Sequence, residues 1–177
     1  VQALEKEGFT ATYLPVHEDG IVRVEEVAAA IRSDTALVTV MYANNEIGAV
    51  QPVPEIGALC RERGVLLHTD AVQAVGNLPI DVTAQNIDLL ALSGHKLNAP
   101  KGIGALYVRR GTKFSPYLVG GHQENGRRGG TANVPYIVGM GRAPEPAMAN
   151  IDDEHTRVRG LRAPLHAGLT SPVPYPR

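Results

Sequence analysis

The chain has 177 residues, of which 44% are hydrophobic and 20% are charged, a composition typical of one globular domain or part of a larger one. Lysine and arginine number 17 against 18 acidic residues, so the net charge of -1 excludes the strongly basic surface of a typical nucleic-acid-binding protein. No apolar run reaches the length of a membrane span. We therefore expect neither nucleic acid nor a membrane as a partner.

The single cysteine and the first residues of the chain indicate the setting. Cys60 stands alone, which excludes an internal disulfide and a cysteine-based zinc site, and we expect no metal centre. A reducing, cytoplasmic location is the default for such a chain. Residues 1–7 lack an initiator methionine and the pattern of a signal peptide, so we expect residue 1 to correspond to the interior of a longer sequence.

Helices and strands are predicted to alternate along the chain. Helices are expected at residues 2–7, 24–32, 52–63 and 134–142, from helical spacing of apolar residues and from prolines and glycines at their ends. Strands are expected at residues 11–16, 36–42, 65–68, 87–92 and 104–108. Short buried strands separated by helices predict an α/β fold with a mostly parallel sheet flanked by helices.

The last part of the chain is rich in proline. Six of the 13 prolines follow Ala143, at positions 144, 146, 164, 172, 174 and 176. A proline inside a helix costs about 3 kcal/mol, so we expect the helix that starts at Val134 to end near Arg142. Residues 151–162 are expected to restart a helix, and residues 170–177 to form no regular element. We expect this tail to be loosely packed.

Polar residues gather where three predicted strands end. The segments 42–46, 68–73 and 93–96 carry amide, carboxylate, imidazole and amine groups. In an α/β sheet, ligands bind outside the carboxyl ends of the strands. Each segment alone is equally well interpreted as an ordinary polar loop. The three together favour a binding site for a small polar ligand.

Lys96 follows the third of these strands. A lysine whose pKa is lowered by desolvation can form a Schiff base with a carbonyl. Asp70, at the end of the neighbouring strand, is suited to hold a pyridine nitrogen protonated, which pyridoxal phosphate chemistry requires. The residues alone leave open a simpler interpretation, in which Lys96 is a solvated lysine in a loop.

Four further side chains complete the predicted site. Ser93 and His95 precede Lys96 and can bond phosphate oxygens. Gln73 and Asn45 can bond a phenolic oxygen or a substrate carboxylate. The set therefore offers an amine, a carboxylate for a ring nitrogen, and groups for a phosphate.

Five segments, in order, resemble one known family. They are ANNEIG at 43–48, HTDAVQAVG at 68–76, LSGHK at 92–96, PKGIGALYVR at 100–109 and GGHQENGRRGGT at 120–131. The chain resembles the cysteine desulfurases of the NifS/IscS type, within the class V aminotransferases, which are fold type I pyridoxal phosphate enzymes. Selenocysteine lyases share much of this pattern. The resemblance implies the large cofactor-binding domain of that fold, truncated at both ends, with pyridoxal 5'-phosphate as cofactor.

The resemblance also implies a role for each matching residue. Lys96 would form the Schiff base with the cofactor and move the proton between substrate and cofactor. Asp70 would pair with the pyridinium nitrogen, and Gln73 would bond the phenolic oxygen. His68 has a structural interpretation instead, as a satisfied core histidine at the end of a buried strand.

The remaining matches concern the phosphate, the substrate and a second subunit. Ser93 and His95 would hold the cofactor phosphate, and Asn45 would lie near the cofactor oxygen and the substrate carboxylate. Thr131 would reach the phosphate of the neighbouring subunit's cofactor, because the family forms homodimers with sites at the interface.

The chain departs from the family where catalysis needs more than the cofactor. No cysteine follows Lys96, whereas the family's catalytic cysteine lies well after the lysine; Cys60 precedes it and is expected to pack inside a helix. The family's substrate-carboxylate arginine and its N-terminal phosphate loop and ring-stacking histidine also have no counterpart. We therefore expect residues 1–143 to be the cofactor-binding core and residues 144–177 a degenerate start of the C-terminal domain.

The resemblance predicts the cofactor-binding core of a cysteine desulfurase, which converts L-cysteine to L-alanine and passes sulfur to an iron–sulfur scaffold or another acceptor. Two alternatives stay open. The chain is either part of a full enzyme or a non-catalytic, decayed remnant. A site without the cysteine would also support slow transamination or elimination.

Overall fold

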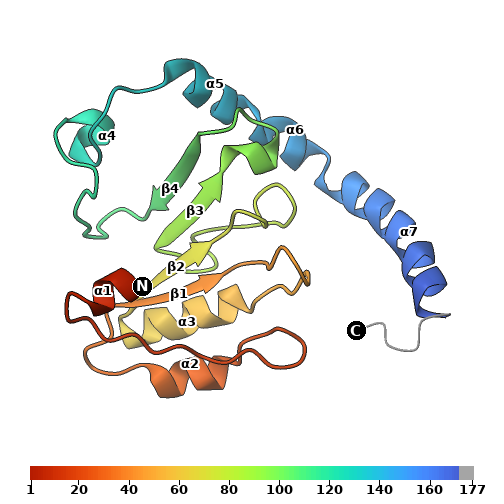
Figure 1. Ribbon diagram of the computed structural model, residues 1–177, viewed down its shortest axis with the longest axis horizontal. Coiled ribbons are helices and arrows are strands. Elements are labelled where there is room, and N and C mark those ends of the chain that lie inside the picture. The colour runs from red at the N-terminus through yellow and green to blue at the C-terminus, as the bar shows by residue number, and fades with distance from the viewer. Residues whose placement is uncertain (172–177) are drawn as a thin grey trace.

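A four-stranded sheet forms the centre of this computed structural model, which describes residues 1–171, and its strand order is β1-β2-β3-β4 (Figure 1). The strands β1, β2 and β3 are parallel, and β4 runs antiparallel to β3. The α/β class and the mostly parallel sheet are thus confirmed. The strands are β1 (Leu37–Met41), β2 (Leu66–Asp70), β3 (Leu89–Ser93) and β4 (Gly104–Val108).

Helices precede, cover and follow the sheet. They are α1 (Gln2–Glu5), α2 (Val24–Ala30), α3 (Val53–Arg63), the 3-10 helix η1 (Gly94–Leu97), α4 (Gln123–Gly126), α5 (Val134–Arg142), α6 (Pro144–Ala149) and α7 (Ile151–Thr170). Helix α3 starts directly after Pro52 and ends at Gly64, which adopts φ 67, a left-handed conformation that glycine tolerates best. Both ends agree with the prediction from the sequence.

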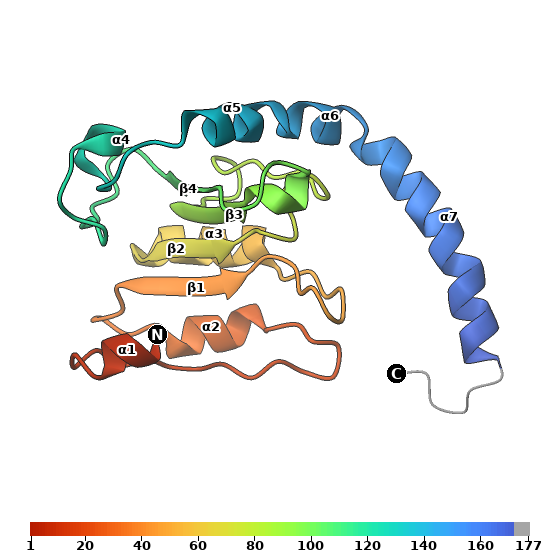
Figure 2. The same cartoon turned by 45° about the horizontal axis from the view of Figure 1, so that its top comes forward.

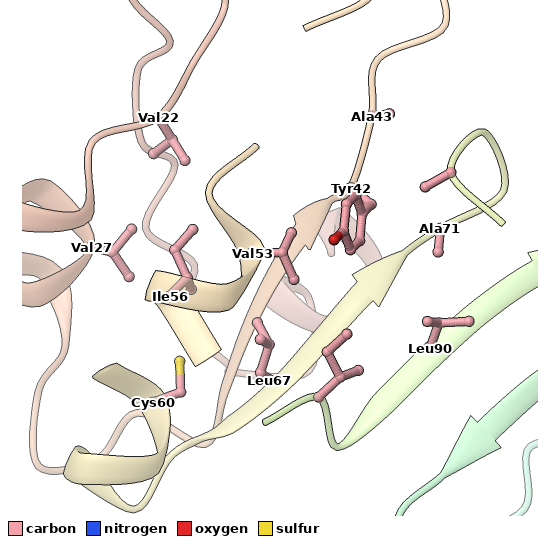
Figure 3. Close-up of a cluster of buried hydrophobic side chains, with 12 residues drawn as sticks. Val22, Val27, Tyr42, Ala43, Val53, Ile56, Cys60, Leu67, Ala71 and Leu90 are labelled. Carbon is pink, nitrogen blue, oxygen red and sulfur yellow. The ribbon is translucent and has the colours of Figure 1, made fainter. Parts of the chain in front are cut away.

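The hydrophobic core lies between α3 and one face of the sheet. Val53, Ile56 and Cys60 of α3 are fully buried, and so is Leu67 of β2. Figure 3 shows these side chains between the helix and the strands, with Leu90 of β3 beside them. Side chains alternate along a strand, so the neighbours of Leu67 on β2 point to the opposite face of the sheet.

The predicted strand at residues 11–16 is wrong. No strand pairs with this segment, which runs past α2 as an irregular stretch (Figure 2). Its apolar side chains are not buried, since Tyr13 and Val16 are 64% and 62% exposed. Pro15 also lacks an N–H for a ladder. The β-branched and aromatic run therefore has neither a hydrogen-bonded neighbour nor a covered face.

The prolines after Ala143 start a helix. Helix α5 ends at Arg142, as predicted, but Pro144 begins α6, because proline fits the first turn of a helix where no N–H partner is needed. Helix α7 begins at Ile151 as expected and continues beyond residue 162 to Thr170, with Pro164 inside it. The predicted irregular tail lies largely outside the described residues. No described helix combines the length and the apolar content that crossing a membrane requires.

Replacing Gly57 by alanine is expected to destabilise the packing of α3. A Cβ at this position would lie 2.0 Å from the backbone oxygen of Gln85, so either the helix or the loop must shift. We expect the free energy of unfolding to fall by about 1–3 kcal/mol, as for other overpacked sites. Urea denaturation measures it, with Gly141→Ala as the matched control, because nothing lies within 4 Å of a Cβ there. Equal stability of the two variants would contradict the close approach.

Candidate active site

Three parallel strands end at one edge of the sheet, and backbone hydrogen bonds continue beyond them. The N–H of Tyr42, just after β1, donates to the oxygen of Asp70 at 2.8 Å. The N–H of Ala71, just after β2, donates to the oxygen of Ala91 at 2.9 Å. The last residue of β2 is therefore fixed between its two neighbouring strands.

The strand register places two predicted site residues on one face of the sheet. Asp70 pairs with Met41 on one side and with Ala91 on the other. Ser93 follows Ala91 by two residues, so its side chain points to the same face as that of Asp70. This face is opposite to the one that packs on α3.

The carboxylate of Asp70 is oriented by its own loop. Its Oδ1 accepts a hydrogen bond from the N–H of Val72 at 3.0 Å. Its Oδ2 has no hydrogen bond within residues 1–171, and the side chain is half-buried. The aspartate thus presents one oxygen to a cationic N–H donor from a ligand.

Lys96 lies in η1, the single turn that follows β3. The Ser93 hydroxyl and Nδ1 of His95 are 2.7 Å apart, which joins the two predicted phosphate ligands. His95 and Lys96 are both exposed. The expected desolvation of the lysine is therefore wrong for residues 1–171, since no described element covers the amine.

The turn that carries Lys96 is supported from below by close packing. A Cβ on Gly94 would lie 2.8 Å from both Cγ2 of Ile103 and Sδ of Met140, so only glycine fits without displacement. Asn98 ends η1 with φ 60, a conformation that asparagine adopts more readily than most residues. These supporting residues were missed from the sequence, although a glycine between Ser93 and His95 is a signal of close approach.

Two further predicted ligands lie in the loops at this edge. Gln73 is half-buried in the turn after β2, and its backbone oxygen accepts a hydrogen bond from Nδ2 of Asn77 at 3.1 Å. Asn45 is exposed in the loop after β1. That loop is shaped by Asn44, whose Oδ1 accepts hydrogen bonds from the next turn's N–H groups at 2.8 and 3.0 Å. The structure thus brings Asn45, Asp70 and Gln73 to the same sheet edge as η1.

Thr131 is not brought to this edge within the chain. It is exposed and lies in the segment between α4 and α5. Figure 1 shows α4 on the side of the sheet to which β4 runs, whereas β1, β2 and β3 point the other way. Any role of Thr131 at the edge therefore needs a second subunit.

His68 lies on the same face as Asp70, two residues earlier on β2. Its Nδ1 is 2.7 Å from the hydroxyl of Thr39 on the neighbouring strand β1. Burial lowers the pKa of His68, and the negative charge of Asp70 opposes this shift. A bonded, half-buried histidine fits the structural interpretation made from the sequence.

Cys60 is expected to be inert toward thiol reagents in the folded protein. Burial raises the pKa of its thiol to about 11, and the negative charge of Asp88 adds to the shift. The side chain is fully buried inside α3. We predict no reaction with a disulfide reagent at about pH 8 in buffer and complete reaction in denaturant, measured by thiol titration. Rapid labelling of the native protein would contradict this burial. Within the described part of the chain, no group of acidic, histidine or cysteine side chains is arranged to hold a metal ion.

Comparison with known sequences identifies the family. Residues 1–171 match the profile described as aminotransferase class-V, so the chain belongs to the class V aminotransferase family. The cysteine desulfurase IscS of Clostridium botulinum is 51% identical over 173 residues, which cover 98% of this chain and 44% of that protein. The cysteine desulfurase IscS of Methanosarcina thermophila is 54% identical over 166 residues, or 94% of this chain and 41% of that protein.

Solved structures agree with this family. A NifS-like protein superposes with a TM-score of 0.91 at 39% identity, covering 95% of this chain and 47% of that structure. A structure described as SspA in complex with cysteine gives a TM-score of 0.79 at 48% identity, covering 81% of this chain and 42% of that structure. The chain is thus built on the fold of fold type I pyridoxal phosphate enzymes and spans less than half the length of these relatives.

Proposed function

We propose that the edge formed by β1, β2 and β3 binds pyridoxal 5'-phosphate and is the cofactor-binding part of a cysteine desulfurase. The observation that carries this proposal is the open carboxylate of Asp70, on the same sheet face as Ser93 and on the strand next to the lysine turn. The donor set suits the cofactor: a carboxylate for its ring nitrogen, an amine for its aldehyde, and a hydroxyl and an imidazole for its phosphate.

The residues of this chain would divide the work among them. Oδ2 of Asp70 would accept the hydrogen bond from the pyridine nitrogen and keep that nitrogen protonated. Nζ of Lys96, which no described element covers, would bond to the cofactor and move a proton at the substrate carbon. Ser93 and His95, already joined to each other, would hold the phosphate.

The other predicted ligands would orient the cofactor and the substrate. Gln73 would donate to the phenolic oxygen, and Asn45 would lie near this oxygen and the substrate carboxylate. Thr131 would act at the phosphate of a partner subunit, which fits its place away from the edge in its own chain. The functional assembly would therefore be a homodimer.

When bound, the cofactor supplies an electron sink that stabilises negative charge at the substrate carbon. The substrate would be L-cysteine and the products L-alanine and a persulfide, from which sulfur would pass to an iron–sulfur scaffold or another acceptor in the cytoplasm. Relatives named cysteine desulfurase, and a similar structure in complex with cysteine, support this substrate. Cys60 would not carry the persulfide, because it is buried in α3.

The chain would divide near Ala143. Residues 1–143 would form the cofactor-binding core, and residues 144–177 would begin the next domain. The exposure of α7 along nearly its whole length, in contrast to the buried α3, supports this division.

Titration with pyridoxal phosphate tests the proposed site. We expect saturable binding, weakened about tenfold or more by Asp70→Asn, because a charge-assisted hydrogen bond to the ring nitrogen is worth about 1.5–3 kcal/mol. Asp34→Asn is the matched control, since Asp34 is an exposed carboxylate paired with Arg32 before the start of β1. Equal affinity of the two variants would argue against the role of Asp70.

A further inference from the structure

The turn after β2, residues 71–77, is connected to the distant helix α7. Nδ2 of Asn77 donates to the backbone oxygen of Gln73 at 3.1 Å. The backbone oxygen of Asn77 in turn accepts a hydrogen bond from Nε2 of His155, on α7. Because a carbonyl oxygen only accepts, His155 carries a hydrogen on Nε2 in this contact. Two successive hydrogen bonds therefore join His155 to Gln73.

Packing holds the same turn in place from two sides. A Cβ on Gly76 would lie 3.4 Å from Cβ of Ala147 on α6 and 2.5 Å from Cδ2 of Leu97 in η1. Leu97 directly follows Lys96 in the chain. The turn that carries Gln73 thus fills the space between the lysine turn and α6, and its position depends on both.

Helix α7 meets the rest of the molecule near its first residues. Ile151 and His155 are half-buried, whereas residues 156–169 are exposed. Figure 2 shows α6 above the sheet and the rest of α7 extending away from it. The hydrogen bond from His155 is therefore part of the anchor of α7, and the same bond reaches the turn with Gln73.

We propose that His155 is a positioning residue that holds Gln73 at the cofactor site through Asn77. This inference rests on the function proposed above, because Gln73 acts only when the edge binds pyridoxal phosphate. Loss of the His155 hydrogen bond releases Asn77 and lets the turn move. The affinity for pyridoxal phosphate then falls about two- to tenfold, the equivalent of one hydrogen bond.

Hydrogen exchange of the cofactor-free protein tests the contact without relying on the proposed function. His155→Ala is expected to speed amide exchange in residues 71–78, and His155→Gln, which keeps an N–H donor, restores slow exchange. His166→Ala is the matched control, because His166 lies on the exposed part of the same helix. Equal exchange in the His155→Ala and His166→Ala variants overturns the proposal.

The absorbance of bound pyridoxal phosphate tests whether the contact acts through Gln73. His155→Ala is expected to shift the visible band and weaken binding, and to have no further effect in a Gln73→Ala background. Additive effects of the two substitutions overturn the proposal, since they place the action of His155 elsewhere. If the unaltered protein does not bind the cofactor, the proposed function fails, and the exchange rates alone decide whether His155 holds the turn.

Discussion

Replacing Asp88 by alanine is expected to lower the free energy of unfolding by about 3–5 kcal/mol, as for other broken buried ion pairs. Asp88, directly before β3, is 5% exposed. Its Oδ1 lies 3.1 Å from Nε of Arg109 and 3.6 Å from a guanidinium nitrogen of Arg61. Its Oδ2 accepts a hydrogen bond from the N–H of Leu67 at 3.0 Å.

The effect is large because the substitution leaves buried partners behind. Arg109 also donates to the backbone oxygens of Val82 and Ile87 at 2.8 and 3.0 Å, so it stays in place after Asp88 is removed. An uncompensated, half-buried cation and an unpaired N–H then remain at the start of two strands. Arg61 is more exposed, so its pairing adds less.

Urea denaturation followed by circular dichroism measures this change. Asp152→Ala is the control, because Asp152 is exposed on α7. We expect the control to stay within about 0.5 kcal/mol of the unaltered protein. A loss of less than about 1 kcal/mol for Asp88→Ala would mean that this network contributes little to the fold.

Lys96→Ala is expected to abolish the visible absorbance band that the protein acquires with pyridoxal phosphate. The band depends on a covalent bond between an amine and the cofactor aldehyde, and the proposed amine is Nζ of Lys96. Because Lys96 is exposed, the substitution should leave the free energy of unfolding within about 0.5 kcal/mol of its original value. The loss can therefore be attributed to the site and not to unfolding.

Lys101→Ala serves as the matched control for this spectrum. Lys101 is also exposed and lies in the turn between η1 and β4. We expect its band to equal that of the unaltered protein. A band that survives in Lys96→Ala, or that disappears equally in both variants, would contradict the assignment.

Much of the fold could be predicted because local signals agreed with the tertiary structure. The strand at residues 104–108 and the end of α3 at Gly64 both lie where the sequence placed them. The segment at residues 11–16 shows the limit of such signals. A strand needs a hydrogen-bonded neighbour, and neither composition nor alternation reveals whether a free sheet edge lies beside it.

The site was predictable in its residues and less so in their environment. The rule that ligands bind at the carboxyl ends of parallel strands brought Asp70 and Lys96 to one edge. The exposure of Lys96 and the contact between His155 and Asn77 depend on which elements pack against the edge. Such contacts, which join residues far apart in the chain, leave no pattern in either local sequence.

Reduction with borohydride after addition of pyridoxal phosphate, followed by peptide mass spectrometry, tests the proposed site most directly. Reduction fixes the cofactor permanently to whichever amine holds it. We predict that the adduct lies on the peptide containing Lys96, at near one cofactor per chain, and that Asp70→Asn decreases it. An adduct spread over Lys6, Lys101 and Lys113, with no preference for Lys96, would show that the edge of the sheet does not form a cofactor site.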